Sequence, residues 1–485
     1  MAFLYPMQQR QGDQLEQRPR GEIYVQGRES PTQGTQDSKK VIEKYNNTSL
    51  ILRILCGIII GAVLALIWPG AISWLPTLGD LFVGALKAIA PVLVFVLVAS
   101  ALAQGTGKLD KRFGTVIFLY MLTTFLAAFV AVVASFMFPQ TMVLEQAATA
   151  DTVPQGIGEV IYNLLMNVIA NPFGALTNAN YIGILFWAAI FGAAMKRIAS
   201  VGSKEFMKNA ADAVSQIVRW IINLAPFGIL GLVYNTVSTN GLAIFTTYGK
   251  LLLLLVGCMA FESLIVNGIV AAVALGRNPY PLIFRCIKES GITAFFTRSS
   301  AANIPINMSL CKRLGLDEDL YSVSIPLGAT INMDGAAITI SVMTLACANT
   351  VGVAVDVPTA LILSVLSTLA ACGASGVAGG SLLLIPMACS LFGISNDTAM
   401  QVVAVGFIIG VVQDSVETML NSSGDVVFAA IAEYRDWLKQ GRRLPGFMYS
   451  KKEREQMHIS KDFPGDTKDT VREAEIAANA ELEYK

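Results

Sequence analysis

The sequence predicts an all-α integral membrane protein, and three observations support this fold class. Of the 485 residues, 54% are hydrophobic and only 14% are charged, whereas a typical soluble domain carries about 25% charged residues. Apolar stretches of about 20 residues, the length that a helix needs to cross a bilayer, recur along the chain. Basic residues occupy alternate loops between these stretches, as in multi-pass membrane proteins.

The two ends of the chain differ in composition from the middle. Residues 1–46 are polar and contain no apolar run, so we expect a disordered tail and no signal peptide. Residues 436–485 are rich in charge, and we expect a cytoplasmic C-terminal tail. The membrane domain is therefore expected to cover residues 47–435.

Six membrane spans are expected before residue 280. They lie near residues 49–69, 80–104, 115–138, 158–195, 210–236 and 249–275. The loops after the second, fourth and sixth spans carry basic residues, and those after the first, third and fifth carry none. The basic residues are Lys108, Lys111, Arg112, Lys196, Arg197, Lys204, Lys208, Arg277, Arg285 and Lys288. The positive-inside rule then places both termini in the cytoplasm.

Net charge and histidine content exclude several function classes. The formal net charge is zero, so no basic excess indicates nucleic-acid binding. The one histidine, His458, lies in the polar C-terminal region. A Ser-His-Asp triad or a histidine metal centre is therefore not expected.

The second half of the chain contains acidic residues without basic partners nearby in sequence. No Lys or Arg occurs from Leu314 to Tyr434, yet four carboxylates lie in the apolar runs there. They are Asp334, Asp414, Glu417 and Asp425. Carboxylates inside a membrane are costly unless their charge is compensated. A proton or a mobile cation such as Na⁺ could compensate it; alternatively, the acids face a water-filled cavity.

Two polar clusters stand out in this half. Asp414, Glu417 or Thr418, Asn421 and Asp425 recur every three or four residues, so they share one face of a helix. Thr330, Asn332 and Asp334 lie between Gly328 and Gly335 with apolar flanks. Oxygens so spaced, and backbone unwound at glycine, suit a hard cation. For the helix face, the alternative is hydrogen bonding between helices that serves only the structure. For the cluster between the glycines, the alternative is an ordinary soluble loop.

Two segments rich in small residues interrupt the apolar runs. The first spans residues 297–305 and the second residues 372–381. An Ile-Pro step lies at the end of the first and shortly after the second, and each segment precedes a helix that carries polar residues. Repeated discontinuous segments of this kind mark the substrate site of many transporters.

Four motifs in this order carry a resemblance to a known family. They are TRSSAANIP, GATINMDGA, GASGVAGG and QDSVETMLNSSGD. The chain resembles the dicarboxylate/amino acid:cation symporters, within the glutamate transporter superfamily, over about residues 48–435. The match is nearest to bacterial members that carry serine and threonine with Na⁺.

The resemblance implies eight transmembrane helices and two re-entrant hairpins, arranged as inverted repeats and assembled as a homotrimer in the bacterial plasma membrane. The hairpins map to about residues 282–310 and 357–392, and the last two spans to about 319–349 and 399–432. A scaffold of about residues 49–104 and 158–236 holds a transport domain of about 115–138 and 249–432. That domain slides across the bilayer as an elevator.

The resemblance also implies roles for individual residues. Substrate contacts fall on Ser299, Ser300, Gly376, Val377, Asp414, Glu417, Thr418 and Asn421. Na⁺ contacts fall on Tyr120, Thr123, Thr124, Gly328, Thr330, Asn332, Asp334, Cys372, Ala374, Asn421 and Asp425. Among these, Asp414 is expected to bind the substrate ammonium. The second hairpin reads Gly-Val-Ala-Gly where the family usually has Gly-Val-Pro-Gly, which leaves the local geometry open.

One departure from the family pattern concerns the substrate. Members that carry acidic substrates have an arginine at the position of Glu417. A glutamate there removes a bidentate partner for a side-chain carboxylate and adds repulsion. The expected substrates are therefore serine and threonine, imported with Na⁺ and without any cofactor. Arg298 is the expected ionic partner of either Glu417 or Asp414.

Two rival functions come from other classes of protein. Asp334 and Asp425 could form the pair of an intramembrane aspartyl protease, but Asn332 and Asn421 have no role in that chemistry. A cation channel would not need two hairpins. We expect a transporter and not an enzyme.

Overall fold

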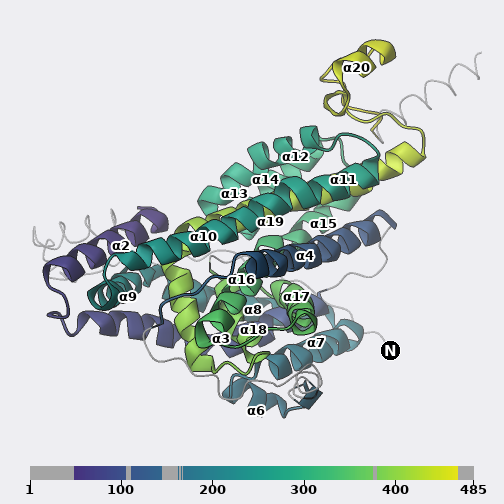
Figure 1. Ribbon diagram of the computed structural model, residues 1–485. Helices are drawn as coiled ribbons and strands as arrows, with labels where there is room; N and C mark the ends of the chain where they lie inside the picture. Colours follow the sequence, from purple (N-terminus) through teal and green to yellow (C-terminus); the bar gives the residue numbers. More distant parts are fainter. Residues whose placement is uncertain are drawn as a thin grey trace, which may run out of the picture. The chain divides into compact units, whose positions relative to one another are not determined.

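The fold is all-helical in a computed structural model of the chain (Figure 1). The structure describes residues 48–104, 111–144, 162, 165–166, 168–374 and 379–467. No β-strand occurs among these residues. The helices are α-helices, apart from two π-helical and two 3₁₀ turns. This agrees with the predicted fold class of an all-α membrane protein.

The helices before residue 280 have the following bounds. They are α2 (Leu50–Ile67), α3 (Leu75–Ala103), α4 (Lys111–Met137), α6 (Pro172–Thr177), α7 (Tyr181–Ile198), α8 (Val201–Asn223), α9 (Ala225–Asn240), α10 (Ala243–Phe261), η1 (Glu262–Val266) and α11 (Asn267–Leu275).

The later helices follow in the same order. They are α12 (Tyr280–Cys286), η2 (Ile287–Gly291), α13 (Ile292–Thr297), α14 (Ser300–Arg313), α15 (Glu318–Ile331), α16 (Asp334–Val351), α17 (Val357–Ala371), η3 (Ser381–Leu384), α18 (Ile385–Ser390), α19 (Asn396–Lys439), η4 (Gly446–Met448) and α20 (Lys451–Met457).

Five helical stretches in the described part of the chain are long and apolar enough to cross a membrane. They are Leu75–Ser100, Lys111–Met137, Ala243–Leu275, Glu318–Val351 and Asn396–Lys439. The last two are largely covered by other parts of the protein, with 94% and 83% of their most apolar windows buried. Helices buried to this degree face protein rather than lipid.

The expected span near 210–236 is divided into two helices. α8 and α9 meet at Leu224 with a bend of 50°. Pro226 lies in the first turn of α9, where its missing N–H costs no hydrogen bond but where it prevents α8 from continuing. The first part of the expected span near 158–195 lies largely outside the described residues, and α6 and α7 occupy the rest.

Both segments rich in small residues separate pairs of helices. The first lies where α13 gives way to α14, at Arg298 and Ser299. Arg298 has a left-handed backbone (φ 49°), which is uncommon for a residue with a Cβ atom and is found at functional sites. The second lies between α17 and η3, and residues 375–378 of it are not described.

The last two expected spans differ in continuity. The first of them is broken, because α15 ends at Ile331 and α16 begins at Asp334. The second, α19, runs unbroken for 44 residues. α19 packs against α4, α10, α11, α14, α15 and α16. It is therefore the common support for both clusters of polar residues.

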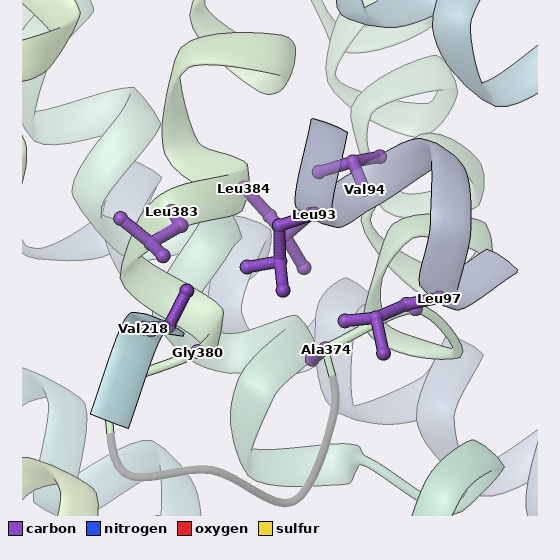
Figure 2. A pocket seen from close by; sticks show the side chains of 9 residues that line it. Leu93, Val94, Leu97, Val218, Ala374, Gly380, Leu383 and Leu384 are labelled. Carbon is purple, nitrogen blue, oxygen red and sulfur yellow. The ribbon is translucent and has the colours of Figure 1, made fainter. Parts of the chain in front are cut away.

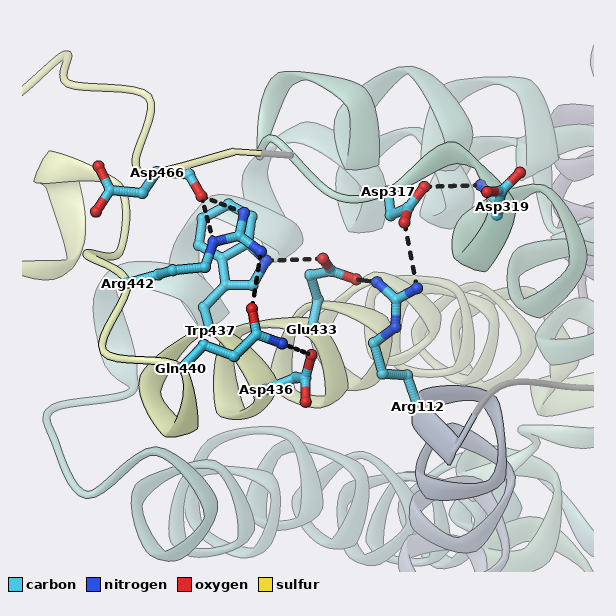
Figure 3. A network of polar contacts seen from close by, with 9 residues as sticks. All are labelled: Arg112, Asp317, Asp319, Glu433, Asp436, Trp437, Gln440, Arg442 and Asp466. Atoms are coloured by element: carbon cyan, nitrogen blue, oxygen red, sulfur yellow. Dashed lines mark hydrogen bonds and ion pairs between the residues drawn. The ribbon is translucent and has the colours of Figure 1, made fainter. Parts of the chain in front are cut away.

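Charged side chains join the end of α19 to two other helices (Figure 3). Glu433 accepts hydrogen bonds from the Nε1 atom of Trp437 (2.7 Å) and from Nη1 of Arg112 (2.8 Å). The Nη2 atom of Arg112 also donates to Asp317 at 3.2 Å. Arg112 lies in the first turn of α4 and Asp317 caps α15, so these ion pairs fix the starts of both helices to α19.

The chain after α19 folds back onto the same end of the protein. The guanidinium of Arg442 lies 4.4 Å from the ring centre of Trp437 and donates to the carbonyl of Asp466. Burial raises the pKa of Asp466, but hydrogen bonds and charge from Arg443 outweigh this and hold the pKa below its ordinary value. Arg277 and Arg285 stack on Tyr449 and Phe447. These two contacts anchor the segment after α19 to Arg277, before α12, and to Arg285, within α12.

Glycines set the closest helix contact among the first helices. Gly57 and Gly61 of α2, a small-x-x-x-small pair, face α9. A Cβ atom at Gly57 would lie 2.4 Å from the carbonyl oxygen of Pro226, and one at Gly61 would lie 2.6 Å from that of Leu230. The two backbones can approach this closely only because both residues lack a side chain.

We predict that Gly57→Ala and Gly61→Ala each lower the melting temperature in detergent. Each added methyl must push α9 away, and overpacking of this kind costs about 1–3 kcal/mol. Gly84→Ala in α3 is the matched control, because nothing lies within 4 Å of a Cβ atom there. Melting temperatures equal to that of the control would contradict the close packing of α2 on α9.

Candidate functional site

Asp334 lies at the break between α15 and α16 and is completely buried. Its Oδ1 atom accepts hydrogen bonds from the hydroxyls of Thr123 (3.2 Å) and Thr124 (2.9 Å) of α4. Its Oδ2 atom has no hydrogen-bond partner among the described residues. The structure thus brings together three of the residues for which the family resemblance implies Na⁺ contacts.

Asn332 and Asp425 form the neighbouring part of this cluster. The Asn332 amide donates to Asp425 Oδ1 at 2.9 Å and to the carbonyl of Asn421 at 3.2 Å. The Asn421 side-chain oxygen accepts from the backbone N–H of Gly335 at 2.8 Å. Asn421 therefore satisfies one of the free N–H groups in the first turn of α16. These contacts bind the broken span to α19.

Tyr120 and Gly328 complete the cluster. The Tyr120 hydroxyl lies 3.3 Å from the carbonyl oxygen of Asp425 and 3.2 Å from that of Ser324, and can donate to either. A Cβ atom at Gly328 would lie 2.5 Å from Asp425 Oδ1 and 2.7 Å from the Tyr120 hydroxyl. Only glycine leaves room for the carboxylate and the phenol at this point.

Three oxygen atoms of this cluster fit a hard cation. Asp334 Oδ2, Asp425 Oδ2 and Asn332 Oδ1 are all buried, and none has a hydrogen-bond partner in the part of the chain that is described. Unpaired buried carboxylates are unfavourable, and Na⁺ is a coupling ion that oxygen ligands hold. Because no donor from the described residues binds these three oxygens, they are available as ligands for a cation.

The residues assigned to a further Na⁺ site lie near one another. The Cys372 thiol is 3.7 Å from the carbonyl oxygen of Ile331, the residue that follows Thr330. The Thr330 side chain is exposed and donates to its own helix, at the carbonyl of Leu327. The assignment of Thr330 to an ion site concerns its backbone. Ala374, in the same turn as Cys372, is buried.

Asp414 on α19 contacts both segments rich in small residues. Its Oδ2 atom lies 3.6 Å from the Nε atom of Arg298, in the turn between α13 and α14. Its Oδ1 atom accepts a hydrogen bond from the backbone N–H of Gly379, between α17 and η3, at 3.1 Å. Of the two possible ionic partners that the sequence left open for Arg298, the structure selects Asp414.

Glu417, one turn further along α19, is held by three donors. Its Oε2 atom accepts from Thr339 (2.8 Å), Ser381 (2.9 Å) and Gln413 (2.5 Å). A Cβ atom at Gly335 would come within 2.9 Å of Glu417, so α16 and α19 touch here. Ser381 is the first residue of η3 and lies two residues after Gly379. The segment between α17 and η3 therefore has two hydrogen bonds to α19, one to Asp414 and one to Glu417.

The other expected substrate residues are placed less directly. The Ser299 hydroxyl accepts from the N–H of Ala302 and so caps α14. Ser300 is buried beside it. The Thr418 hydroxyl donates to the carbonyl of Asp414 at 2.8 Å. Gly376 and Val377 lie outside the described residues.

Sequence reasoning did not identify several polar residues of this region. Gln413, Thr339 and Ser381 are the donors to Glu417. Gln413 lies four residues before Glu417 on the same helix, which is the one spacing that could have signalled it. A second network, in which the Asn303 and Asn307 amides donate to the Ser422 hydroxyl, fastens α14 to α19.

A small apolar cavity lies between α3, α8 and the segment that joins α17 to η3 (Figure 2). Its volume is about 10 Å³, roughly that of one water, so no amino acid fits there. Leucine, valine, alanine and glycine line it. They are Leu93, Val94, Leu97, Val218, Gly373, Ala374, Gly380, Leu383 and Leu384. The cavity is distinct from the polar residues around Asp414.

Comparison with known proteins identifies the family. The sequence profile of the sodium:dicarboxylate symporter family matches residues 50–434. A serine/threonine transporter SstT of Bifidobacterium adolescentis is 67% identical over 419 residues, which cover 86% of this chain and 97% of that protein. A serine/threonine transporter SstT of Streptococcus thermophilus is 58% identical over 402 residues, or 83% of this chain and all of that protein.

A further relative carries the same name. The serine/threonine transporter SstT of Streptococcus agalactiae is 59% identical over 396 residues, which cover 81% of this chain and 98% of that protein. These proteins are transporters and not enzymes, which confirms that expectation and excludes the protease alternative. The chain therefore belongs to the sodium:dicarboxylate symporter family and is a multi-pass, Na⁺-coupled membrane transporter.

Proposed function

We propose that this protein imports serine and threonine by symport with Na⁺. One observation carries the proposal: residues at the turns of both hairpins converge on Asp414, and a buried cluster with unpartnered oxygens lies two to three helical turns further along α19. A substrate site and an ion site on one helix are what a symporter requires. The names of the relatives support the choice of substrate.

In this proposal Asp414 binds the substrate ammonium. The carboxylate is buried, and a charge-assisted contact in such a place is strong. Ser299 and Ser300 bind the α-carboxylate from the first hairpin, together with Thr418 and Asn421 on α19. Gly376 and Val377 are assigned to the same substrate site.

Glu417 sets the preference for a neutral side chain. It is buried, and its carboxylate faces the same hairpin segment as Asp414. A second carboxylate brought to this place by aspartate or glutamate would be repelled. A hydroxyl could instead donate to Glu417 in exchange for one of its present donors. Serine and threonine meet this requirement.

The Na⁺ ions are assigned to the oxygen-rich residues of the cluster. One site takes Tyr120, Thr123, Thr124, Asn332 and Asp334. A second takes Asn332, Asn421, Asp425 and the carbonyl of Gly328. A third takes the backbone around Thr330 and Cys372–Ala374. The unpartnered oxygens of Asn332, Asp334 and Asp425 support the first two assignments.

The proposed movement is that of an elevator within a homotrimer. Eight spans and two hairpins divide into a scaffold, containing α2, α3 and α7–α9, and a transport domain with α4, α10, α11 and α12–α19. The cavity in Figure 2 lies between these two parts and is lined by apolar residues of both. Both termini face the cytoplasm of a bacterial plasma membrane.

Uptake into proteoliposomes tests this function. We predict that an inward Na⁺ gradient drives accumulation of radiolabelled serine above its external concentration, and that replacing Na⁺ with K⁺ abolishes accumulation. Unlabelled threonine should compete, whereas aspartate and glutamate should not. A cation channel would pass Na⁺ without concentrating serine, and that result would overturn the proposal.

A second prediction concerns Glu417. We expect Glu417→Arg to lower serine uptake at least tenfold, because the arginine occupies space and leaves donors unpaired, and we expect aspartate to begin to compete. The reason is that a guanidinium pairs bidentately with the aspartate side chain. The measurement is a competition assay with serine, threonine, aspartate and glutamate.

Glu417→Gln is the matched control, because it removes the negative charge without adding a cation. Aspartate should compete less with this variant than with Glu417→Arg. Both variants must first be shown to insert and to elute as the parent protein does. Normal serine uptake by Glu417→Arg, without competition by aspartate, would show that Glu417 does not contact the substrate side chain.

A further inference from the structure

Glu262 is a buried acid that none of the assignments above uses. It follows the last residue of α10 and begins the π-helical turn η1, inside the stretch Ala243–Leu275 that is apolar enough to cross a membrane. Its side chain is completely buried. Neither carboxylate oxygen has a hydrogen-bond partner in the described ranges. Within those ranges Glu262 also forms no ion pair.

The π-helical turn brings a second polar residue onto the same face. The backbone N–H of Asn267, five residues later, donates to the carbonyl of Glu262. In an α-helix two residues five apart point about 140° away from each other, whereas the wider π turn brings them closer to alignment. Asn267 is 4% exposed, and its side-chain oxygen also has no partner among the residues described.

Both residues lie beside Asp334. The charge of Asp334 acts on Glu262, and the Asn267 side chain interacts with the Asp334 carboxylate. The helices carrying them are also in contact, since η1 packs on α4 and α10 packs on α16. Both oxygens of Glu262, Oδ1 of Asn267 and Oδ2 of Asp334 are buried in this part of the protein, and none has a hydrogen-bond partner among the described residues.

Two neighbouring carboxylates in an apolar interior repel each other unless a positive charge lies between them. No described Lys or Arg pairs with either Glu262 or Asp334. Carboxylate and amide oxygens are the ligands that hard cations take. π-helical turns inside α-helices occur frequently at functional sites, which is consistent with a binding role for this one.

We propose that Glu262 and Asn267 are ligands of the Na⁺ ion that Asp334 binds. The helix pair α10–α11 then contributes directly to an ion site that would otherwise be built from α4 and the broken span. The inference rests on the proposed Na⁺ symport. It makes the ion affinity depend on a helix that makes no contact with the proposed substrate.

The test uses the full-length protein in proteoliposomes and measures serine uptake against Na⁺ concentration. The parent protein is measured first, since a lack of Na⁺ dependence there would refute the proposed function rather than this inference. We expect Glu262→Gln to raise the Na⁺ concentration for half-maximal uptake at least fivefold. At saturating Na⁺ the KM for serine should stay within twofold of the parent value, which a general structural defect would not give.

Glu433→Gln is the matched control. Glu433 is equally a buried glutamate, but its oxygens already accept from Trp437 and Arg112. Its half-maximal Na⁺ concentration should equal that of the parent. If Glu262→Gln does not fold, Asn267→Ala removes one proposed ligand without changing charge, and it should raise the half-maximal Na⁺ concentration by a smaller factor.

One result would overturn the inference: a half-maximal Na⁺ concentration that is unchanged in Glu262→Gln, or in Asn267→Ala where that variant is the one measured. If the pH dependence of uptake is lost at the same time, Glu262 holds a proton and not Na⁺.

Discussion

The compensation of buried negative charge is the constraint on which the rest of this structure depends. Glu262, Asp334 and Asp425 lie among apolar helices with no basic side chain bound to them in the described residues. Such charges are stable only when other groups or ions surround their oxygens. Protein donors reach one oxygen of Asp334 and one of Asp425 and leave the other free. Under the proposed function, Na⁺ completes this arrangement.

The interruptions in the helices follow from the same constraint. A continuous helix uses all of its internal backbone groups, whereas a break exposes them to an ion or to a side chain. Between α15 and α16 the break is stabilised by Asn421, which binds the first turn of α16. Asn421 lies on α19 between Asp414 and Asp425. Under the proposed function, one helix therefore carries both the substrate site and the ion site, with Asn421 between them.

Much of the fold could be predicted from the sequence, because apolar length and broken motifs are local signals. The turn at Arg298, the break at Asn332 and the polar face of α19 were all visible in the chain. The bend at Leu224 was not, since a proline in a long apolar run is compatible with one span. In the sequence, Glu262 is a lone acid inside the expected span 249–275 and gives no signal of a site. Its proximity to Asp334 arises only from packing between distant helices.

The two oxygens of Asp414 contact different segments of the chain, and under the proposed function substrate changes only one of these contacts. Oδ1 is bonded to the N–H of Gly379 in the second hairpin. Oδ2 has no hydrogen bond and only the ionic contact with Arg298 in the first. An ammonium group that binds Oδ2 competes with Arg298 and leaves the bond to Gly379 intact. Under the proposed function, substrate thus releases Arg298 from α19 while Gly379 stays bound, and the amides of Asn303 and Asn307 keep α14 attached to Ser422.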